Sequence, residues 1–359
     1  MGQGTASSGT SACTHGGMYS VNHKLVKVDC SSSVNPLGTP PGALRAIVKH
    51  AKELSSRYPD PECTELRKSL SEYLALDPSW IVVANGAVEI IYWFAQAFAG
   101  KAVVIPAPTF CEYELASQLA GATVRFAQMR QFMLDSDSII RQARGADALY
   151  LCNPNNPTGL LATSEIERII TNVDKQTVVL LDECFIELVD NTDRNSLVAK
   201  LEEFDNLIIL RSLTKSFGLA GLRVGYACCK PSSVEKLKMR RIPWNVNGLA
   251  QAAGVAALSD SKYLARARRI IARERKFLFE RLSRTKSFVP MYSDVNYFML
   301  DLRDKDSTTF RDSLLRKTGV LVRDCSTFTG MDRHHVRIAV KTRSEDLRLV
   351  KALEVFNSG

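Results

Sequence analysis

The chain has no apolar run that approaches the roughly 20 residues a membrane-spanning helix needs, and its start shows no basic segment followed by an apolar one. These two absences argue against a membrane anchor and against a secretory signal. The start also lacks an N-myristoylation signal, because Ala6 stands where that signal has Ser or Thr. We therefore expect a cytoplasmic protein that has no membrane partner.

No C-x-x-C spacing occurs, although the sequence contains nine cysteines. Zinc sites and disulfide frameworks use closely and regularly spaced cysteines. Most of these cysteines lie instead within apolar runs. The pattern predicts reduced, packed cysteines of a cytosolic protein, and no metal site is expected.

Acidic residues are in the minority, since 38 Asp and Glu stand against 47 Lys and Arg and give a net charge of +9. Such a surface could attract nucleic acid or a phosphorylated substrate. Much of the excess lies in residues 263–286, where Leu264, Ile271 and Leu278 recur at helical spacing. A solvated amphipathic helix is the simpler interpretation, because no zinc-finger, RNA-binding or helix-turn-helix pattern accompanies it. We expect no nucleic-acid partner.

The 359 residues, 45% of them hydrophobic, are enough for two domains. After Trp80, short apolar runs alternate with helical segments. Strands are predicted at residues 81–83, 103–105, 123–126, 148–151, 178–181, 207–210 and 224–228, and helices at residues 87–98, 112–120, 136–144 and 164–173. This alternation predicts an α/β fold with a mostly parallel central sheet covered by helices. Ligands of such sheets lie beyond the carboxyl ends of the strands.

The pattern changes after Pro243 and predicts a smaller α+β domain. After Pro243, helices are expected at residues 247–258, 263–285 and 344–356, and strands at residues 297–300, 320–322 and 336–340. Two further helices are expected before Trp80, at residues 42–58 and 62–76. We divide the chain into an N-terminal arm (1–41), a large domain (42–243) and the smaller domain (244–359). The arm should pack near the smaller domain, and its first dozen residues, mostly Gly, Ser, Thr and Ala, should be disordered.

One lysine stands among small hydroxyl residues directly after the apolar residues 207–210. Ser212 and Thr214 precede Lys215, and Arg223 follows it eight positions later. Burial and a nearby cation depress the pKa of a lysine, which frees its amine to form an imine with an aldehyde. Serine, threonine and arginine are residue types that bind a phosphate. Taken alone, the segment could equally be a strand, a turn and a surface lysine.

Two further candidates follow the first predicted strands of the sheet. Gly86, Ala87 and Val88 open a helix, where free backbone N–H groups can cradle a phosphate. Phe110, after the next strand, could stack on a planar ring or pack in the core.

Two more candidates follow later strands. The loop at residues 153–159 is dense in asparagine and proline and contains Asn156. Asp182 follows the apolar residues 178–181, and a carboxylate there needs a charged partner unless it caps a helix or joins an ion pair.

The order and spacing of these groups resemble those of the fold type I pyridoxal-phosphate enzymes, the aspartate aminotransferase superfamily, across nearly the whole chain. The resemblance implies pyridoxal 5'-phosphate (PLP) as cofactor and Lys215 as the catalytic lysine. It implies that Asn156 bonds the phenolic oxygen of PLP and that Asp182 keeps the pyridine nitrogen protonated. The implied cofactor-binding residues are Gly86, Ala87, Val88, Phe110, Asn156, Asp182, Ser212, Thr214, Lys215 and Arg223.

The resemblance also implies a homodimer. Tyr58, before a proline-rich break, resembles the tyrosine that reaches from one subunit of these enzymes to the PLP phosphate of the other. It is therefore the last residue of the implied cofactor-binding set.

Within the superfamily, four segments resemble the threonine-phosphate decarboxylases of corrinoid (cobalamin) biosynthesis: residues 15–17, 35–38, 182–185 and 212–215. This resemblance implies PLP-dependent decarboxylation of O-phospho-L-threonine, a phosphorylated amino acid, to (R)-1-amino-2-propanol phosphate. The implied substrate-binding residues are His15, Gly16, Asn35, Asn156, Arg323 and Arg337.

Histidinol-phosphate aminotransferases are the alternative, because they share the loop at residues 153–159. They usually have tyrosine in place of Phe185 and lack the His-Gly-Gly of residues 15–17. Residues 30–33 and Met18, in turn, depart from the decarboxylase pattern. A third alternative is a regulator that uses a PLP fold as a sensor, but such proteins carry a winged helix ahead of that fold. Only about thirty poorly structured residues precede it here, so we expect an enzyme.

Overall fold

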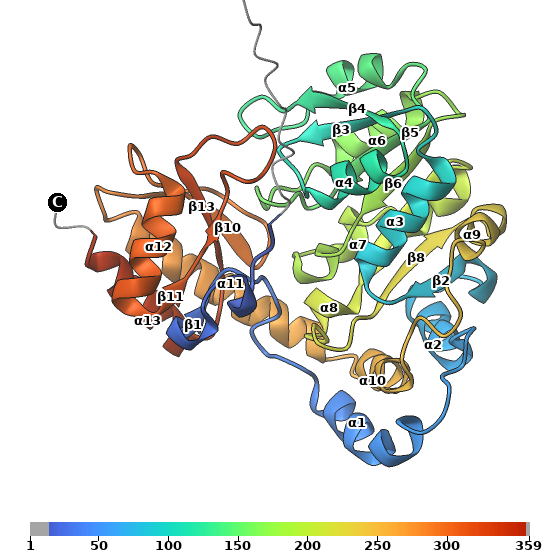
Figure 1. The fold of residues 1–359 in the computed structure, drawn as a ribbon, viewed down its shortest axis with the longest axis horizontal. Coiled ribbons are helices and arrows are strands. Elements are labelled where there is room, and N and C mark those ends of the chain that lie inside the picture. The colour runs from blue at the N-terminus through green and yellow to red at the C-terminus, as the bar shows by residue number, and fades with distance from the viewer. Residues whose placement is uncertain (1–13, 357–359) are drawn as a thin grey trace, which may run out of the picture.

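The computed structural model describes residues 14–356, so the expectation for the first dozen residues lies outside the described part. Its centre is a seven-stranded sheet in the order β2-β8-β7-β6-β5-β3-β4 (Figure 1). These strands are β2 (Ile81–Ala84), β3 (Ala102–Ala107), β4 (Thr123–Gln128), β5 (Ala148–Cys152), β6 (Val178–Asp182), β7 (Leu207–Ser212) and β8 (Gly225–Cys229). β8 pairs antiparallel with both of its neighbours, β2 and β7, and all other pairs in this sheet are parallel. This confirms the mostly parallel α/β arrangement.

Helices pack against this sheet and bury its apolar strands. The helices of this part are α3 (Ala87–Phe98), α4 (Glu112–Leu119), α5 (Ser136–Ala143), α6 (Thr163–Asn172), α7 (Thr192–Asn195), α8 (Leu213–Ser216) and α9 (Pro231–Lys238). α3 packs on α4, and α5 packs on α6. Every residue of β7 and β8 is buried, as expected for central strands with helices on both faces.

A second, antiparallel sheet forms the smaller unit, in the order β12-β13-β10-β9. It consists of β9 (Val289–Pro290), β10 (Tyr297–Asp301), β12 (Arg323–Asp324) and β13 (His335–Ala339), and its helices are α11 (Tyr263–Leu282), α12 (Ser307–Thr318) and α13 (Arg343–Glu354). The strand predicted at residues 320–322 is divided, because β11 (Val320–Leu321) pairs with β1 (Val28–Asp29) of the arm instead of with β13. The N-terminal arm therefore lies against the smaller unit.

The apolar packing crosses residue 244, the domain boundary expected from the sequence. α10 (Gly248–Leu258) packs on α1 (Pro41–Leu54) and α2 (Thr64–Leu74), and its buried alanines join the core of the large sheet. Ile271 of α11 belongs to that same core, whereas Leu278 belongs to the core of the smaller unit. The two cores thus divide within α11, which runs from the smaller unit towards α8 (Figure 1). The boundary at residue 244 stays a prediction.

The cysteines partly correct the sequence-based expectation. Those that are free are Cys30, Cys63, Cys152, Cys184, Cys228, Cys229 and Cys325. Cys111 forms a disulfide, so the expectation of reduced cysteines is wrong for this residue. Cys111 differs from most of the free cysteines in its exposure, because it is only half-buried at the start of α4, whereas most of the free thiols are buried. Within residues 14–356, no helix has both the length and the hydropathy that crossing a bilayer requires.

Candidate active site

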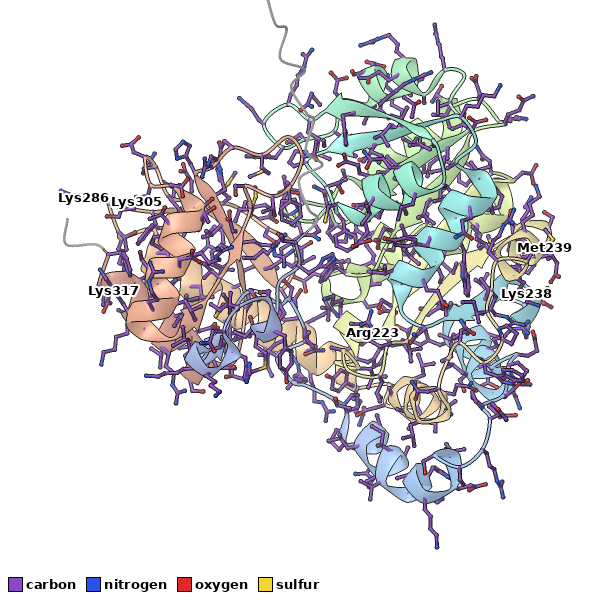
Figure 2. All side chains as sticks on the ribbon, viewed as in Figure 1. Arg223, Lys238, Met239, Lys286, Lys305 and Lys317 are labelled. Carbon is purple, nitrogen blue, oxygen red and sulfur yellow. The ribbon has the colours of Figure 1, made fainter. Side chains whose placement is uncertain are left out.

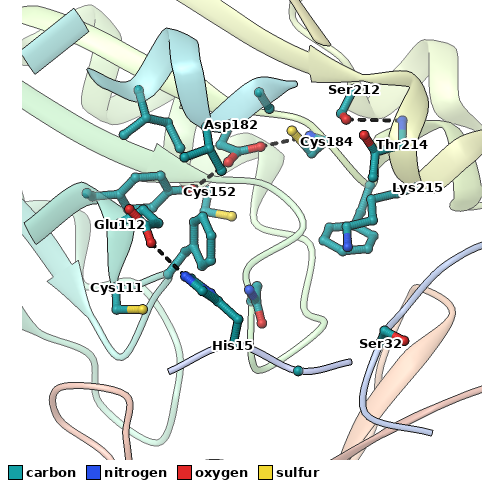
Figure 3. Close-up of a pocket in the computed structure, with 18 of the residues that line it drawn as sticks. His15, Ser32, Cys111, Glu112, Cys152, Asp182, Cys184, Ser212, Thr214 and Lys215 are labelled. Atoms are coloured by element: carbon teal, nitrogen blue, oxygen red, sulfur yellow. Dashed lines mark hydrogen bonds and ion pairs between the residues drawn. The ribbon is translucent and has the colours of Figure 1, made fainter. Parts of the chain in front are cut away.

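A cavity of about 320 Å³ opens at the carboxyl edge of the large sheet (Figure 3). β5, β6 and β7 end there with Cys152, Asp182 and Ser212, because parallel strands finish at the same edge. The N-terminal arm and the smaller unit form the remaining walls. The residues predicted from the sequence that line the cavity are His15, Gly16, Ala87, Val88, Phe110, Asn156, Asp182, Ser212, Thr214, Lys215, Arg223, Arg323 and Arg337.

Lys215 lies on the short helix α8, immediately after β7. The side chain of Ser212 accepts a hydrogen bond of 3.2 Å from the backbone N–H of Thr214 and so starts this turn. Loss of hydration, followed by the positive charge of Arg337, lowers the pKa of Lys215 to about 8. Its Nζ lies 5.9 Å from the centre of the Phe185 ring. About a tenth of the amine is therefore neutral at pH 7, far more than for an unperturbed lysine, and the neutral amine is the form that acts as a nucleophile.

Asp182 ends β6 as a buried carboxylate that receives hydrogen bonds from Tyr113 and Cys184. The hydroxyl of Tyr113 donates to Oδ2 at 2.6 Å, and the backbone N–H of Cys184 donates to Oδ1 at 2.9 Å. Burial raises the pKa of Asp182, and the hydrogen bonds from Cys184 and Tyr113 oppose that rise. A cationic group in the cavity would stabilise the ionised form further.

Several groups that suit an anion line the cavity near the start of α3. The buried Oγ1 of Thr214 has no hydrogen-bond partner among the described residues. The Arg223 side chain comes so close to Gly86 that a Cβ at Gly86 would lie 2.6 Å from its Nη2. A guanidinium, a helix N-terminus and an unpartnered hydroxyl together fit a phosphate group.

Arg323 and Arg337 enter the cavity from β12 and β13, where they occupy paired positions. Arg323 Nη1 donates to Thr14 Oγ1 at 3.1 Å, and Arg337 Nη2 donates to the Ser31 carbonyl at 3.0 Å. Arg337 Nη1 also donates to Oδ1 of Asn156. Among residues 14–356, the hydrogen-bond acceptors of both arginines are neutral oxygens, and Arg337 Nε is buried without a partner.

Burial is the main cause of the lowered pKa of both arginines. The pKa of Arg323 falls to about 10, and the positive charge of Arg337 is the second cause. The pKa of Arg337 is also lowered by burial. Asp324 and Asp29 lie close enough to act on Arg323 and Arg337 through their charge, but no carboxylate of residues 14–356 hydrogen-bonds either guanidinium, so this wall of the cavity can accept an anionic ligand.

The N-terminal arm closes one side of the cavity through His15. Its Nε2 lies 2.7 Å from Oε1 of Glu112, the first residue of α4, as Figure 3 shows. The other Glu112 oxygen accepts a 2.9 Å hydrogen bond from the hydroxyl of Tyr92. At Gly16, a Cβ would lie only 2.5 Å from the Ser31 carbonyl, so glycine lets the arm pass close to that wall.

Three predicted site residues do not line the cavity. Gly86 precedes the lining residue Ala87, and its lack of a side chain leaves room for the Arg223 guanidinium. Asn35 lies behind the lysine turn, where its backbone N–H donates to the Lys215 carbonyl at 3.0 Å and its side chain to the Ser216 carbonyl at 2.7 Å. Tyr58 is 82% exposed, and its ring lies 4.8 Å from that of Trp244 on the surface.

Several lining residues were missed by the sequence analysis, namely Thr14, Ser31, Ser32, Ile91, Cys111, Glu112, Tyr113, Cys152, Cys184 and Phe328. Cys152 had an available signal, because it directly follows the strand predicted at residues 148–151, as Asp182 follows the strand predicted at residues 178–181. Glu112 and Tyr113 follow Phe110 closely, yet their contacts with His15 and Asp182 join distant segments that no local pattern reveals.

Comparison with known proteins decides the family. The profile described as aminotransferase class I and II matches residues 26–353. The chain belongs to this family. Its fold is that of the fold type I PLP enzymes and its cofactor is pyridoxal 5'-phosphate, as the sequence predicted. Lys215, the unpartnered Thr214 hydroxyl and the buried Asp182 are consistent with that cofactor, since they suit its aldehyde, phosphate and ring nitrogen.

Members of the aminotransferase class I and II family that resemble this chain carry two kinds of name. A Caldanaerobacter subterraneus subsp. tengcongensis protein with the provisional name threonine-phosphate decarboxylase is 35% identical over 90% of this chain and 88% of its own length. A histidinol-phosphate aminotransferase of Symbiobacterium thermophilum is 34% identical over 92% of this chain and 90% of its own. The solved structure of the histidinol-phosphate aminotransferase from Clostridium acetobutylicum aligns with a TM-score of 0.86 and 30% identity, covering 92% of this chain and 99% of the other.

The pKa of Lys215 predicts a pH-dependent stability of the PLP-free protein. This pKa is about 8 in the folded state, against 10.5 for an unperturbed lysine. The unfolded chain binds more protons between these values, so the free energy of unfolding must rise with pH across that window. The free energy of unfolding of the unsubstituted protein, minus that of Lys215→Met, should rise by up to about 3 kcal/mol between about pH 7 and about pH 11.

Urea unfolding of both proteins at a series of pH values measures this difference. Lys276→Met is the matched control, because the Lys276 side chain is 79% exposed. Its difference curve should stay flat over the same range. A flat curve for Lys215→Met as well would contradict the lowered pKa of Lys215.

Proposed function

We propose that the protein is a PLP-dependent carboxy-lyase that converts O-phospho-L-threonine to (R)-1-amino-2-propanol phosphate and carbon dioxide in cobalamin biosynthesis. The observation that carries the proposal is the pair of buried arginines, Arg323 and Arg337, facing the cavity without a carboxylate partner among the described residues. The substrate offers two anionic groups, a carboxylate and a phosphate, and the planar fork of arginine suits both. The similarity to the Caldanaerobacter protein supports the same reaction.

The polar parts of PLP each have a counterpart in the cavity. We assign the PLP phosphate to Ser212, Thr214, Arg223 and the backbone N–H groups that follow Gly86, at Ala87 and Val88. Asp182 is assigned to the ring nitrogen and Asn156 to the phenolic oxygen. Phe110 is assigned to the face of the ring and Lys215 to the aldehyde carbon. When bound, PLP withdraws electrons from the bonds at the substrate Cα and so makes each of them easier to break.

The side chains of the protein decide which bond at the substrate Cα breaks. That bond is the one held perpendicular to the cofactor ring, so a decarboxylase must hold the carboxylate out of the ring plane. Arg323 and Arg337 on one wall and His15 on the arm can fix the substrate in that orientation. With PLP and substrate bound, Lys215 would be the residue that returns a proton to Cα, because its pKa of about 8 suits proton transfer near neutral pH.

Transamination of histidinol phosphate is the second candidate, and the similarity to the Symbiobacterium and Clostridium enzymes favours it. Histidinol phosphate has no carboxylate, so a carboxylate-binding arginine would have no partner on that substrate. The co-substrate 2-oxoglutarate has two carboxylates, however, and could use both arginines. We prefer the decarboxylase because the arm brings His15 to the cavity beside the two arginines, where a phosphate and a carboxylate can be held together.

We further propose that the protein is a homodimer with shared active sites. The rings of Tyr58 and Trp244 lie 4.8 Å apart, and Met239 and Ile242 of the adjoining segment are 73% and 71% exposed (Figure 2 labels Met239). Arg241 ties this segment to residues near Tyr58 by donating to the Pro61 carbonyl at 2.7 Å. Exposed apolar residues gathered in this way are typical of a subunit interface, from which Tyr58 would reach the PLP phosphate of the partner.

The first experiment measures the reaction class. With PLP bound, the protein should release carbon dioxide from O-phospho-L-threonine and form aminopropanol phosphate. It should form no glutamate from histidinol phosphate and 2-oxoglutarate. Labelled carbon dioxide and mass spectrometry of the products report the two reactions, and Lys215→Ala is the inactive control. Glutamate formation without carbon dioxide release would overturn the proposal in favour of the aminotransferase.

The two arginines should act on the substrate and leave the cofactor in place. Arg323→Ala and Arg337→Ala should each lower kcat/KM for O-phospho-L-threonine at least about 100-fold, which corresponds to about 3 kcal/mol of transition-state binding. Arg311→Ala is the matched control, because Arg311 bonds Asp312 nearby and does not line the cavity. Steady-state kinetics with the PLP content measured in parallel test this prediction. Unchanged kinetics in either cavity variant would remove that arginine from the substrate site.

Hybrid dimers test the shared active site. One subunit carries Lys215→Ala and the other carries Tyr58→Ala, each with a different affinity tag. The hybrid then has one site with both residues intact, so it should recover about half of the unsubstituted activity per dimer, whereas both parent homodimers are impaired. Activity no higher than the mean of the two parents would show that Tyr58 does not serve the site of the partner.

A further inference from the structure

Tyr113 lies beside the proposed cofactor site and has no role assigned so far. It is the second residue of α4 and is only 1% exposed. Its ring stacks on Tyr150 at 5.1 Å and meets Phe110 edge-on at 5.7 Å. Ring contacts on two sides therefore fix the direction of its hydroxyl, which donates to Oδ2 of Asp182 at 2.6 Å.

We infer that Tyr113 is a positioning residue for the cofactor: its hydroxyl keeps the Asp182 carboxylate ionised and turned towards the ring nitrogen of PLP. This inference rests on the role proposed above for Asp182. Tyr113 touches Asp182 and acts on the cofactor through it.

The geometry of Asp182 explains why a second donor matters. The backbone N–H of Cys184 holds Oδ1 at 2.9 Å, and Tyr113 holds Oδ2. Donors on two different oxygens prevent the carboxylate from rotating about its Cβ–Cγ bond. Without the hydroxyl, the donors that remain both belong to Cys184, its backbone N–H and its thiol, and Oδ2 loses the hydrogen bond from α4.

The charge of Asp182 depends on the same hydrogen bond. Burial raises the pKa of this carboxyl, and the bonds from Cys184 and Tyr113 counteract the rise. Loss of the Tyr113 hydroxyl would raise the pKa further and draw the shared proton from the ring nitrogen towards Asp182. A less positive PLP ring would withdraw fewer electrons, so the pH at which the near-visible band of the PLP-bound protein changes would be higher.

The neighbouring groups do not replace Tyr113. The titratable groups that interact with Asp182 are Tyr113, Cys152, Cys184, Lys215 and Tyr297. Burial, together with the negative charge of Asp182, raises the pKa of the Tyr113 hydroxyl and of both thiols, so all three keep their protons at working pH. Tyr113 is thus a permanent donor to this carboxylate.

The test compares two substitutions that each remove one oxygen from the same ring stack. Tyr113→Phe removes the donor to Asp182. Tyr150→Phe is the matched control, because the Tyr150 hydroxyl contacts Ser117 Oγ at 3.1 Å and not Asp182. Tyr113→Phe should weaken PLP binding by about tenfold or more, the scale of a hydrogen bond to a charged group, whereas Tyr150→Phe should stay within about twofold.

Two readouts are independent of turnover. One is the dissociation constant of PLP, titrated into PLP-free protein and followed by absorbance. The other is the pH midpoint of the near-visible band of the PLP-bound protein, which should move to higher pH in Tyr113→Phe only. Thermal unfolding of each PLP-free variant shows whether the stack still folds, and phenylalanine keeps both ring contacts.

A double-substitution cycle separates the possible failures. In an Asp182→Ala background, adding Tyr113→Phe should weaken PLP binding no further, because the hydroxyl then has no carboxylate to hold. If Asp182→Ala binds PLP as tightly as the unsubstituted protein, the proposed cofactor site is itself wrong. If Asp182→Ala loses PLP while Tyr113→Phe behaves like Tyr150→Phe, or weakens binding equally in the Asp182→Ala background, the inference about Tyr113 alone is overturned.

Discussion

The removal of charged groups from water at one edge of the large sheet is the constraint on which this site depends. Lys215, Asp182, Arg323 and Arg337 all face one cavity, and burial is the largest cause of the pKa shift of each. Three of these groups are basic and one is acidic. Because three of the four are basic, an anionic ligand in the cavity would offset part of the cost of burying them.

The rest of the structure holds these groups in place against that cost. β6 and β7 are buried along their length and bring Asp182 and the lysine turn to the same edge. The smaller sheet sets Arg323 opposite Arg337 on an antiparallel pair, where like charges are unfavourable without a ligand. The arm is tied to this unit by the β1–β11 pairing and to the lysine turn by Asn35. Three distant segments thus meet in one site.

The sequence predicted the parts of the site that depend on strand ends. Asp182 and Lys215 each follow an apolar run that forms a strand. Because these two strands are parallel, the residues that follow them emerge at the same edge of the sheet. Contacts between distant segments left no such signal. Asn35 was expected to touch substrate but bonds the Ser216 carbonyl, 181 positions away, and the Tyr113–Asp182 bond spans 69 positions. The division of residues 320–324 into β11 and β12 likewise depends on pairing with the arm and with β13.

The same division explains why overall similarity does not separate a decarboxylase from an aminotransferase here. Both reactions need a basic lysine and an electron-withdrawing ring, and the two residues that we propose for these tasks, Lys215 and Asp182, stand at the ends of strands of the large sheet. The reactions differ in which bond at Cα stands perpendicular to that ring, and this depends on the groups that grip the remainder of the substrate. The residues that we propose for this grip, Arg323, Arg337 and His15, come from the smaller sheet and the arm. Relatives of the two names are 35% and 34% identical to this chain, so overall identity does not tell the two reactions apart, and the side chains around the substrate are where a difference has to be sought.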